Sequence, residues 1–180
     1  MRILPEETCC VVVDYQEKFM PVIAEKESLI CNSVKLLEGL KILEIPVLVT
    51  AQYAKGLGLN IPEIRSAAGT EEYCDKKSFS IYGDAGARAQ LQGYGRKNVI
   101  LCGIEAHICV LQSLLDLKEA GYQPILVENC ISSRKLSDKE TAIRRAVAEG
   151  AIITSYESLL FELMQSAEHE KFKQISNLIK

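Results

Sequence analysis

Short apolar runs recur along the chain at fairly regular intervals, and longer polar or amphipathic stretches separate them. Most of these runs are apolar at successive rather than alternate positions, so a strand formed there would be buried on both faces, as in a parallel sheet. The predicted strands cover residues 8–13, 47–50, 73–76, 99–102, 124–127 and 151–154. Residues 73–76 are the least apolar of these segments.

The stretches between the predicted strands carry apolar residues at helical spacing. In residues 27–44 these side chains recur every three or four positions and form one stripe. Two capping boxes, Ser137–Glu140 and Thr154–Glu157, predict the starts of two later helices. Residues 51–68 contain Gly and Pro and predict a long irregular loop, a type of segment that often carries function. The predicted helices cover residues 27–44, 84–95, 110–121, 137–150, 155–165 and 167–178.

The alternation of strands and helices predicts an α/β fold, with residues 1–180 forming a single domain around a parallel sheet and right-handed crossovers. In such sheets, ligands bind beyond the carboxyl ends of the strands. Asp14, Thr50, Lys76 and the 103–109 turn each follow a predicted strand directly, so we expect them to converge on one rim.

Composition narrows the class of protein. The chain has 180 residues, 48% of them hydrophobic, and a net charge of −3 without a Lys/Arg block, which argues against nucleic acid and anionic membranes as partners. No apolar segment has the length of a membrane span or a secretory signal, so we expect a cytoplasmic protein. Seven cysteines without a CxxC pair and only two histidines predict reduced thiols, no metal site and no cofactor.

One cysteine lies in a distinctive position. The run 99–102 stops at Gly103, and a predicted helix follows, with Cys109 at its entrance. Aligned backbone N–H groups there favour an anion, so this position should lower the pKa of the thiol and make Cys109 the most reactive of the seven cysteines. The alternative is a small, buried, unreactive thiol.

A carboxylate and an ammonium group are predicted at the same rim. Asp14 could instead cap a surface turn, and Lys76 or Lys77 could be a solvated loop charge. Together with Cys109, however, they form a plausible catalytic set, in which the carboxylate takes the thiol proton and the ammonium stabilises the charges.

At this point the sequence resembles the isochorismatase-like hydrolases, also known as cysteine hydrolases, over nearly its whole length. The segments that carry the resemblance are weak singly but specific in their order and spacing. They are residues 12–16 (VVDYQ), 49–58 (VTAQYAKGLG), 76–80 (KKSFS), 103–110 (GIEAHICV), 131–134 (ISSR), 150–154 (GAIIT) and 157–162 (ESLLFE).

The resemblance implies a three-layer α/β/α sandwich with a mostly parallel, Rossmann-like sheet of five to six strands. It also implies a catalytic triad of Asp14, Lys76 and Cys109, with Lys76 selected over Lys77 by its spacing to Phe-Ser. A cis peptide between Ile104 and Glu105 would turn backbone N–H groups at the Cys109 turn toward a substrate carbonyl. Members that bind a metal carry histidines after the second strand, and this chain has none there, so no metal is expected. The substrate pocket is expected to include Gln16, Phe19, Gln52, Tyr53 and Phe79.

These observations predict a hydrolase that cleaves a small amide or related acyl compound through a Cys109 thioester. The family implies self-association, so the expected partners are a small-molecule substrate and further copies of the chain. The rival hypothesis is a non-catalytic binding protein on the same scaffold. A dinucleotide-dependent oxidoreductase is disfavoured, because neither 56–58 nor 93–95 follows a strand and opens a helix with a third spaced glycine.

Overall fold

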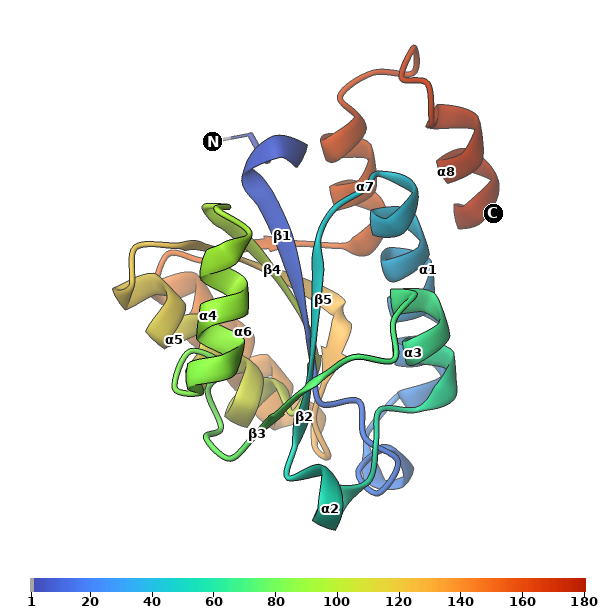
Figure 1. Ribbon diagram of the computed structural model, residues 1–180. Helices are drawn as coiled ribbons and strands as arrows, with labels where there is room; N and C mark the ends of the chain where they lie inside the picture. The colour runs from blue at the N-terminus through green and yellow to red at the C-terminus, as the bar shows by residue number, and fades with distance from the viewer. Residues whose placement is uncertain (1) are drawn as a thin grey trace.

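The structure is a computed structural model, which describes residues 2–180 (Figure 1). Its centre is a six-stranded, all-parallel sheet with the strand order β3-β2-β1-β4-β5-β6. The chain begins in the middle of the sheet, builds one half outward and then returns to build the other half. The strands are β1 (Thr8–Val13), β2 (Val47–Gln52), β3 (Cys74–Lys76), β4 (Asn98–Ile104), β5 (Gln123–Ser132) and β6 (Ile152–Thr154).

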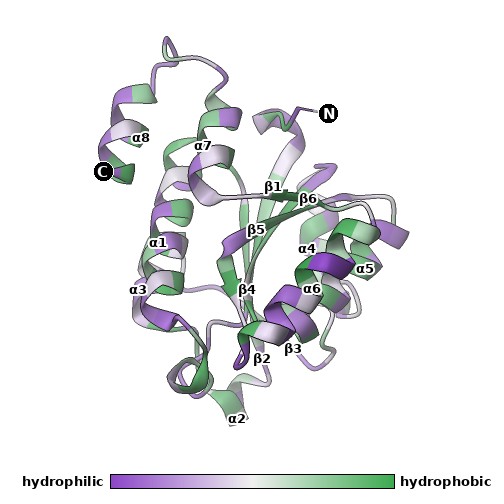
Figure 2. Cartoon of the chain, turned by 180° about the vertical axis from the view of Figure 1, so that it is seen from behind, coloured by the Kyte–Doolittle hydropathy of each residue, from purple (hydrophilic) through white to green (hydrophobic). Residues whose placement is uncertain are grey.

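Helices cover both faces of the sheet and complete the predicted three-layer α/β/α sandwich (Figures 1 and 2). One face packs against α1 (Lys26–Ile42), α3 (Pro62–Ala68), α7 (Tyr156–Met164) and α8 (Phe172–Ile179). The other face packs against α4 (Ala85–Gly93), α5 (Leu111–Glu119) and α6 (Leu136–Ala148). The remaining elements are α2 (Ala54–Leu57), the π-helical turn η3 (Ala106–Val110), which leads directly into α5, and two 3-10 turns, η1 (Pro5–Glu7) and η2 (Met20–Val22).

Strand β1 explains why continuous apolar runs predicted this fold. All six of its residues are buried, with Cys10 and Val12 packing toward α1 while Val11 and Val13 pack toward α5. A strand with helices on both faces needs apolar side chains at every position. Figure 2 shows the result, with hydrophobic colour along the strands and hydrophilic colour on the outer surface of α6.

Several local predictions are wrong. The expected loop 51–68 contains α2 and α3. Ser137 does not cap α6, because the helix begins one residue earlier, with Lys135 at the N-cap position and no side-chain cap. Thr154 does not cap α7 either: the N-cap is Ser155, whose hydroxyl accepts from Ser158 N at 3.3 Å. Strand β5 runs to Ser132, past the predicted end at 127, and its register with β4 shifts between Leu101 and Gly103.

Within residues 2–180, no helix combines the length and apolar character needed to cross a membrane. The strand order reverses between β1 and β4, which are neighbours in the sheet although β2 and β3 come between them in sequence. In open α/β sheets, such a reversal leaves a crevice at the carboxyl ends of the two strands. This edge lies toward the bottom of Figure 1, where α2 is also found.

Candidate active site

Asp14 is the first residue after β1 and lies in the crevice. Its backbone is left-handed, with φ of 54°, which is uncommon for a residue with a side chain and turns the chain sharply at the strand end. The Asp14 carboxylate accepts hydrogen bonds at both oxygens: Oδ1 from Thr50 Oγ1 at 2.8 Å and Oδ2 from Lys76 Nζ at 2.6 Å. Asp14 is 2% exposed, so these two bonds replace the water that would otherwise solvate the carboxylate.

Lys76 ends β3 and is completely buried. Besides Asp14, its ammonium donates to Gln52 Oε1 at 2.7 Å and to the carbonyl of Phe79 at 3.1 Å, with the Ser78 carbonyl at 3.4 Å. These acceptors account for all three N–H bonds of the ammonium group. The structure therefore pairs Lys76 with Asp14, and the catalytic role assigned to Lys76 stays a prediction.

Lys77 points the other way, as expected for the next residue after a strand. Its side chain is 67% exposed, lies 3.9 Å from Asp75 Oδ2 and places its ammonium 4.1 Å from the centre of the Tyr53 ring.

Cys109 lies in η3, just after β4, and is 7% exposed. Its pKa is raised from 9.0 to about 12, first because burial disfavours the thiolate and second because the Asp14 carboxylate is nearby, while the Lys76 ammonium opposes the rise. The expectation that the helix entrance lowers this pKa is therefore wrong. The resting group is a neutral thiol beside an ion pair, because burial and the Asp14 carboxylate outweigh the Lys76 ammonium in setting the pKa of Cys109.

The turn from β4 to η3 brings Cys109 to the ion pair. Gly103 has φ of 131°, and a Cβ atom there would lie 2.0 Å from the Val13 carbonyl oxygen, so only glycine lets β4 approach β1 this closely. The Ile104–Glu105 peptide bond is cis, as the family resemblance implied. The Glu105 carboxylate is held by Arg134, whose backbone N and side-chain Nε donate to Oε2 at 3.0 and 3.1 Å.

Asp14, Cys109 and the cis-peptide residues border a cavity of about 250 Å³. Four of the five residues predicted to form the pocket line it, together with Asp14, Cys109 and the cis-peptide residues. Leu57 and Ile108 also line it, although the sequence analysis did not select them, because single apolar residues in a loop or a helical turn are usually packing residues. The lining residues are Asp14, Phe19, Gln52, Tyr53, Leu57, Phe79, Ile104, Glu105, Ile108 and Cys109.

Gln16 is the predicted pocket residue that does not line the cavity. It is completely buried, and its side chain joins backbone groups of the neighbouring loop. Its Nε2 donates to the carbonyls of Gln52 and Gly58 at 3.0 and 2.6 Å, and its Oε1 accepts from Gln52 N at 2.8 Å. Gln16 therefore positions the loop that carries Gln52 and Tyr53 and has no free polar atom to offer a ligand.

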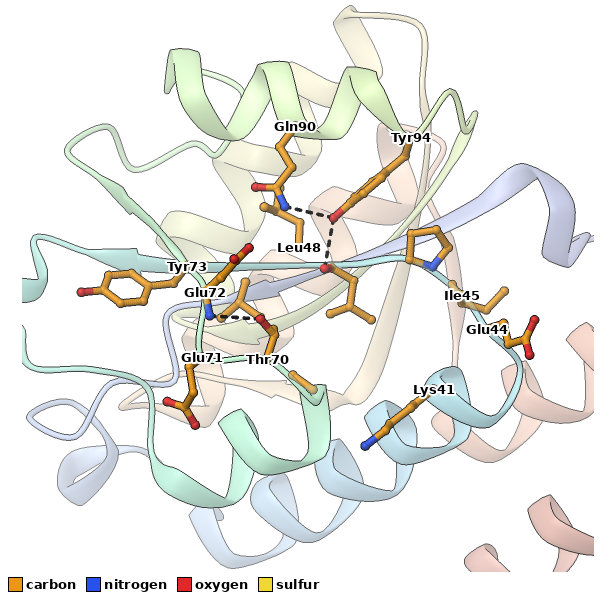
Figure 3. A pocket seen from close by; sticks show the side chains of 14 residues that line it. Lys41, Glu44, Ile45, Leu48, Thr70, Glu71, Glu72, Tyr73, Gln90 and Tyr94 are labelled. Carbon is orange, nitrogen blue, oxygen red and sulfur yellow. Dashed lines mark hydrogen bonds between the residues drawn. The ribbon is translucent and has the colours of Figure 1, made fainter.

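A larger groove of about 820 Å³ lies at the other end of β2 (Figure 3). Its floor is the uncovered edge of β2, where the Val47 carbonyl accepts from Tyr94 Oη at 3.1 Å and Gln90 Nε2 donates to the same hydroxyl at 3.2 Å. Lys41 reaches toward it from α1, and Glu71 and Glu72 border it on the segment before β3. No cysteine or histidine lines this groove.

No group of three or more His, Cys, Asp or Glu residues within 2–180 is arranged to hold a metal ion. His107, next to the cis-peptide turn, faces α6 rather than the pocket. Its Nδ1 lies 2.9 Å from Ser133 Oγ and its Nε2 lies 3.9 Å from Asp138.

Comparison with known proteins agrees with this architecture. Over 179 residues the chain is 36% identical to isochorismatase domain-containing protein 1 of Salmo salar, a match that covers 99% of this chain but only 63% of that protein. The structure of the MAR1 ribonuclease from Caenorhabditis elegans is 37% identical and superposes with a TM-score of 0.92, covering 99% of this chain and 92% of the other.

The fold is also shared by the Escherichia coli YcaC gene product, described as an octameric hydrolase of unknown specificity. It is 17% identical, with a TM-score of 0.94 and coverage of 99% of this chain and 89% of the other. The model of the isochorismatase domain matches residues 8–158, which include the Asp14, Lys76 and Cys109 positions. The chain therefore belongs to the isochorismatase family.

Proposed function

We propose that this protein is a cysteine hydrolase that cleaves the C–N bond of a small amide, or the equivalent bond of a related acyl compound. Family membership supports a hydrolase. The observation that carries the amide chemistry is the buried Asp14–Lys76 ion pair beside the neutral Cys109 thiol in a small cavity.

The first half of the reaction forms a thioester. Asp14 takes the proton from the Cys109 thiol while the sulfur attacks the substrate carbonyl carbon, and the carbonyl electron pair moves to oxygen to give a tetrahedral oxyanion. Backbone N–H groups at the Cys109 turn stabilise that oxyanion. When the oxyanion collapses, the C–N bond breaks, and Asp14 returns its proton to the leaving amine.

The second half regenerates the enzyme. A water molecule attacks the thioester carbonyl as Asp14 takes one of its protons, and collapse of the second tetrahedral species releases the carboxylic acid and the sulfur, which recovers its proton from Asp14. Lys76 keeps the site electrically balanced throughout, because its ammonium stays within hydrogen-bond reach of Asp14. Thr50 and Gln52 are positioning residues, since they bind Asp14 and Lys76 respectively.

The direct test is ammonia release from a panel of small primary amides, with Cys109→Ala as the inactive variant. Cys31→Ser is the matched control, because Cys31 is an exposed thiol in α1. We expect hydrolysis by the native protein and Cys31→Ser, none by Cys109→Ala, and an acyl adduct on Cys109 by mass spectrometry after acid quenching. Amide hydrolysis that persists in Cys109→Ala would overturn the mechanism.

RNA is the rival substrate, because the C. elegans neighbour is named as a ribonuclease. A net charge of −3 and a pocket with apolar walls favour the small amide over a polyanion. A cleavage assay on labelled RNA with native protein and Cys109→Ala distinguishes the two; Cys109-dependent RNA cleavage without amide hydrolysis would replace our proposal. If neither substrate is cleaved but a small amide binds, the protein is a binding module on the same scaffold.

Self-association is a separate part of the proposal. The octameric description of the E. coli neighbour supports it. Light scattering coupled to size-exclusion chromatography measures the assembly directly, and a mass of 20.0 kDa, that of one chain, would contradict it.

A further inference from the structure

The charges around the pocket restrict what can bind there. Lys76 is the cation closest to the reacting atoms, but its three N–H bonds are already directed at Asp14 Oδ2, Gln52 Oε1 and backbone carbonyls. It is also completely buried. A carboxylate on a substrate could not pair with Lys76 without displacing one of these acceptors, of which Asp14 is the group proposed to take the thiol proton.

Glu105 adds negative charge to the wall of the pocket. Both contacts from Arg134 go to Oε2, so Oε1 accepts no hydrogen bond from residues 2–180. Arg134 is not among the residues that line the cavity, and its Nε donates to Glu105. The carboxylates that line the cavity are therefore Asp14 and Glu105, and no lining residue supplies a cation.

The rest of the wall is apolar or aromatic. The space beside Cys109 is enclosed by Phe19, Leu57, Ile104 and Ile108. It is flanked by Tyr53 and Phe79, residues that are 46% and 53% exposed. Lys77 touches Tyr53, but its ammonium is in water and screened by salt. At about 250 Å³ the cavity is smaller than the typical site for a drug-sized ligand.

We infer that the substrate is an uncharged small amide with a compact apolar acyl group, and that the pocket discriminates against substrates with a free carboxylate. This inference rests on the proposed amide hydrolysis and names its substrate class. A carboxylate in this pocket would lose its hydration without gaining a cation and would face two other carboxylates. An apolar chain would instead be removed from water against apolar side chains.

The test compares three primary amides of similar size. Butyramide ends in a methyl group, succinamate ends in a carboxylate, and succinamide replaces that carboxylate by a neutral group of nearly the same shape. We expect kcat/KM for butyramide to be the highest and that for succinamate to be at least about 100-fold lower than that for butyramide. Succinamide should lie between them, because it shares the size of succinamate but not its charge. A succinamate value equal to or above that of butyramide would overturn the inference.

A charge introduced into the wall provides a second measurement. Leu57→Lys places an ammonium on a lining residue of the short helix α2, whereas Lys55→Leu changes the charge of the same helix at a residue that does not line the cavity. Leu57→Lys should raise the ratio of succinamate to butyramide turnover by about tenfold or more, and Lys55→Leu should leave it within about twofold. An unchanged ratio in Leu57→Lys would count against charge exclusion.

Binding separates this inference from the proposed chemistry. Calorimetric titration of Cys109→Ala with the three intact amides measures recognition without turnover. Preferential binding of butyramide, with no hydrolysis by the native protein, would sustain the pocket's selectivity and reject the reaction. Equal binding of all three amides, or binding of none, would reject the substrate class itself.

Discussion

The two cavities at opposite ends of β2 differ in size and in chemistry. The groove at the start of the strand is more than three times larger, at about 820 against 250 Å³, yet its polar groups belong to exposed segments and to the capped Val47 carbonyl. The smaller pocket at the carboxyl end holds a fully buried ion pair and a thiol. Volume is thus a poor guide to chemistry, and buried charges that hold each other in place are a better one.

The difference arises from how the sheet ends at each edge. At the carboxyl edge, β1, β2, β3 and β4 each place a residue of the proposed active site in the same crevice. At the other edge, β3 is too short to cover the first half of β2, so the groove is a gap left by a missing neighbour. Matched substitutions in the two regions can test whether hydrolysis depends on the pocket at the carboxyl edge and not on the groove.

The largest contrast is expected from removing one charge in each region. Lys76→Met should lower amide hydrolysis by at least about 10³-fold, because Asp14 loses its buried partner. Lys41→Met in the groove should leave hydrolysis within about twofold. Steady-state ammonia release measures both, and equal losses in the two variants would remove the functional distinction between the cavities.

Unfolding must be separated from lost chemistry in that experiment. Lys76→Met leaves a buried carboxylate unpaired, which typically costs about 3–5 kcal/mol, whereas the double variant Asp14→Asn/Lys76→Met has no such charge. The double variant should recover most of the free energy of unfolding in urea titrations but none of the activity. Recovered activity would show that the ion pair is structural only.

A second contrast concerns two glycines with positive φ, one packed against the backbone of a neighbouring strand and one in open space. Gly103→Ala should destabilise the fold by about 3 kcal/mol, because its Cβ would meet the Val13 backbone next to Asp14. Gly95→Ala is the matched control: Gly95 also has a positive φ, of 63°, but no atom lies within 4 Å of an added Cβ. We expect only about 1–2 kcal/mol there from conformational strain, measured by urea denaturation. Similar values for the two variants would mean that the contact with β1 relaxes freely.

A third contrast is between thiols. With its pKa raised to about 12, Cys109 has about a thousandfold less thiolate than a thiol of pKa 9.0, which greater intrinsic nucleophilicity offsets only in part. Iodoacetamide should therefore label the exposed Cys31 about 30-fold faster than Cys109 at pH 8, the reverse of the order expected from the sequence. The rate at Cys109 should rise about tenfold per pH unit up to pH 11.

The charges beside Cys109 determine the direction in which each substitution shifts the pH dependence of Cys109 alkylation. The Asp14 carboxylate raises the pKa of the thiol and the Lys76 ammonium lowers it. Asp14→Asn should move the alkylation profile to lower pH although it abolishes hydrolysis, and Lys76→Met should move it to higher pH. Lys77→Ala should do neither. Peptide mapping by mass spectrometry follows each thiol, and a shift in Lys77→Ala alone would reassign the lysine.

The apolar runs predicted the strands and placed Asp14 and the Cys109 turn at strand ends, whereas Lys76 and the three layers came from the family resemblance, because residues 73–76 do not form a continuous apolar run. The sequence could not predict the protonation state of Cys109, since burial depends on packing from several elements. The prediction that Gln16 lines the pocket is wrong for a related reason. A polar residue near a strand end can bind a ligand, but the side-chain amide of Gln16 is hydrogen-bonded to backbone groups of Gln52 and Gly58. The prediction that Ser137 caps α6 is wrong because the helix begins one residue earlier, at Leu136.

The smallest effect is expected from the hydroxyl that orients Asp14. Thr50→Val keeps the side-chain shape and removes the donor to Asp14 Oδ1, a hydrogen bond to a charged group that is worth about 1.5–3 kcal/mol. Hydrolysis should fall by about tenfold or somewhat more, because the Asp14 carboxylate has lost the hydrogen bond that orients it.

Two further variants test whether that effect is specific to the hydroxyl at Asp14. Thr50→Ser keeps the donor and should retain most of the activity. Thr154→Val makes the same substitution on β6, where the hydroxyl donates to the Ser155 carbonyl at 3.4 Å, away from the pocket, and should leave the activity unchanged. If Thr50→Ser lowered hydrolysis as much as Thr50→Val, the hydrogen bond to Asp14 would not explain the loss, and Thr50 would act by packing within the sheet rather than by orienting that carboxylate.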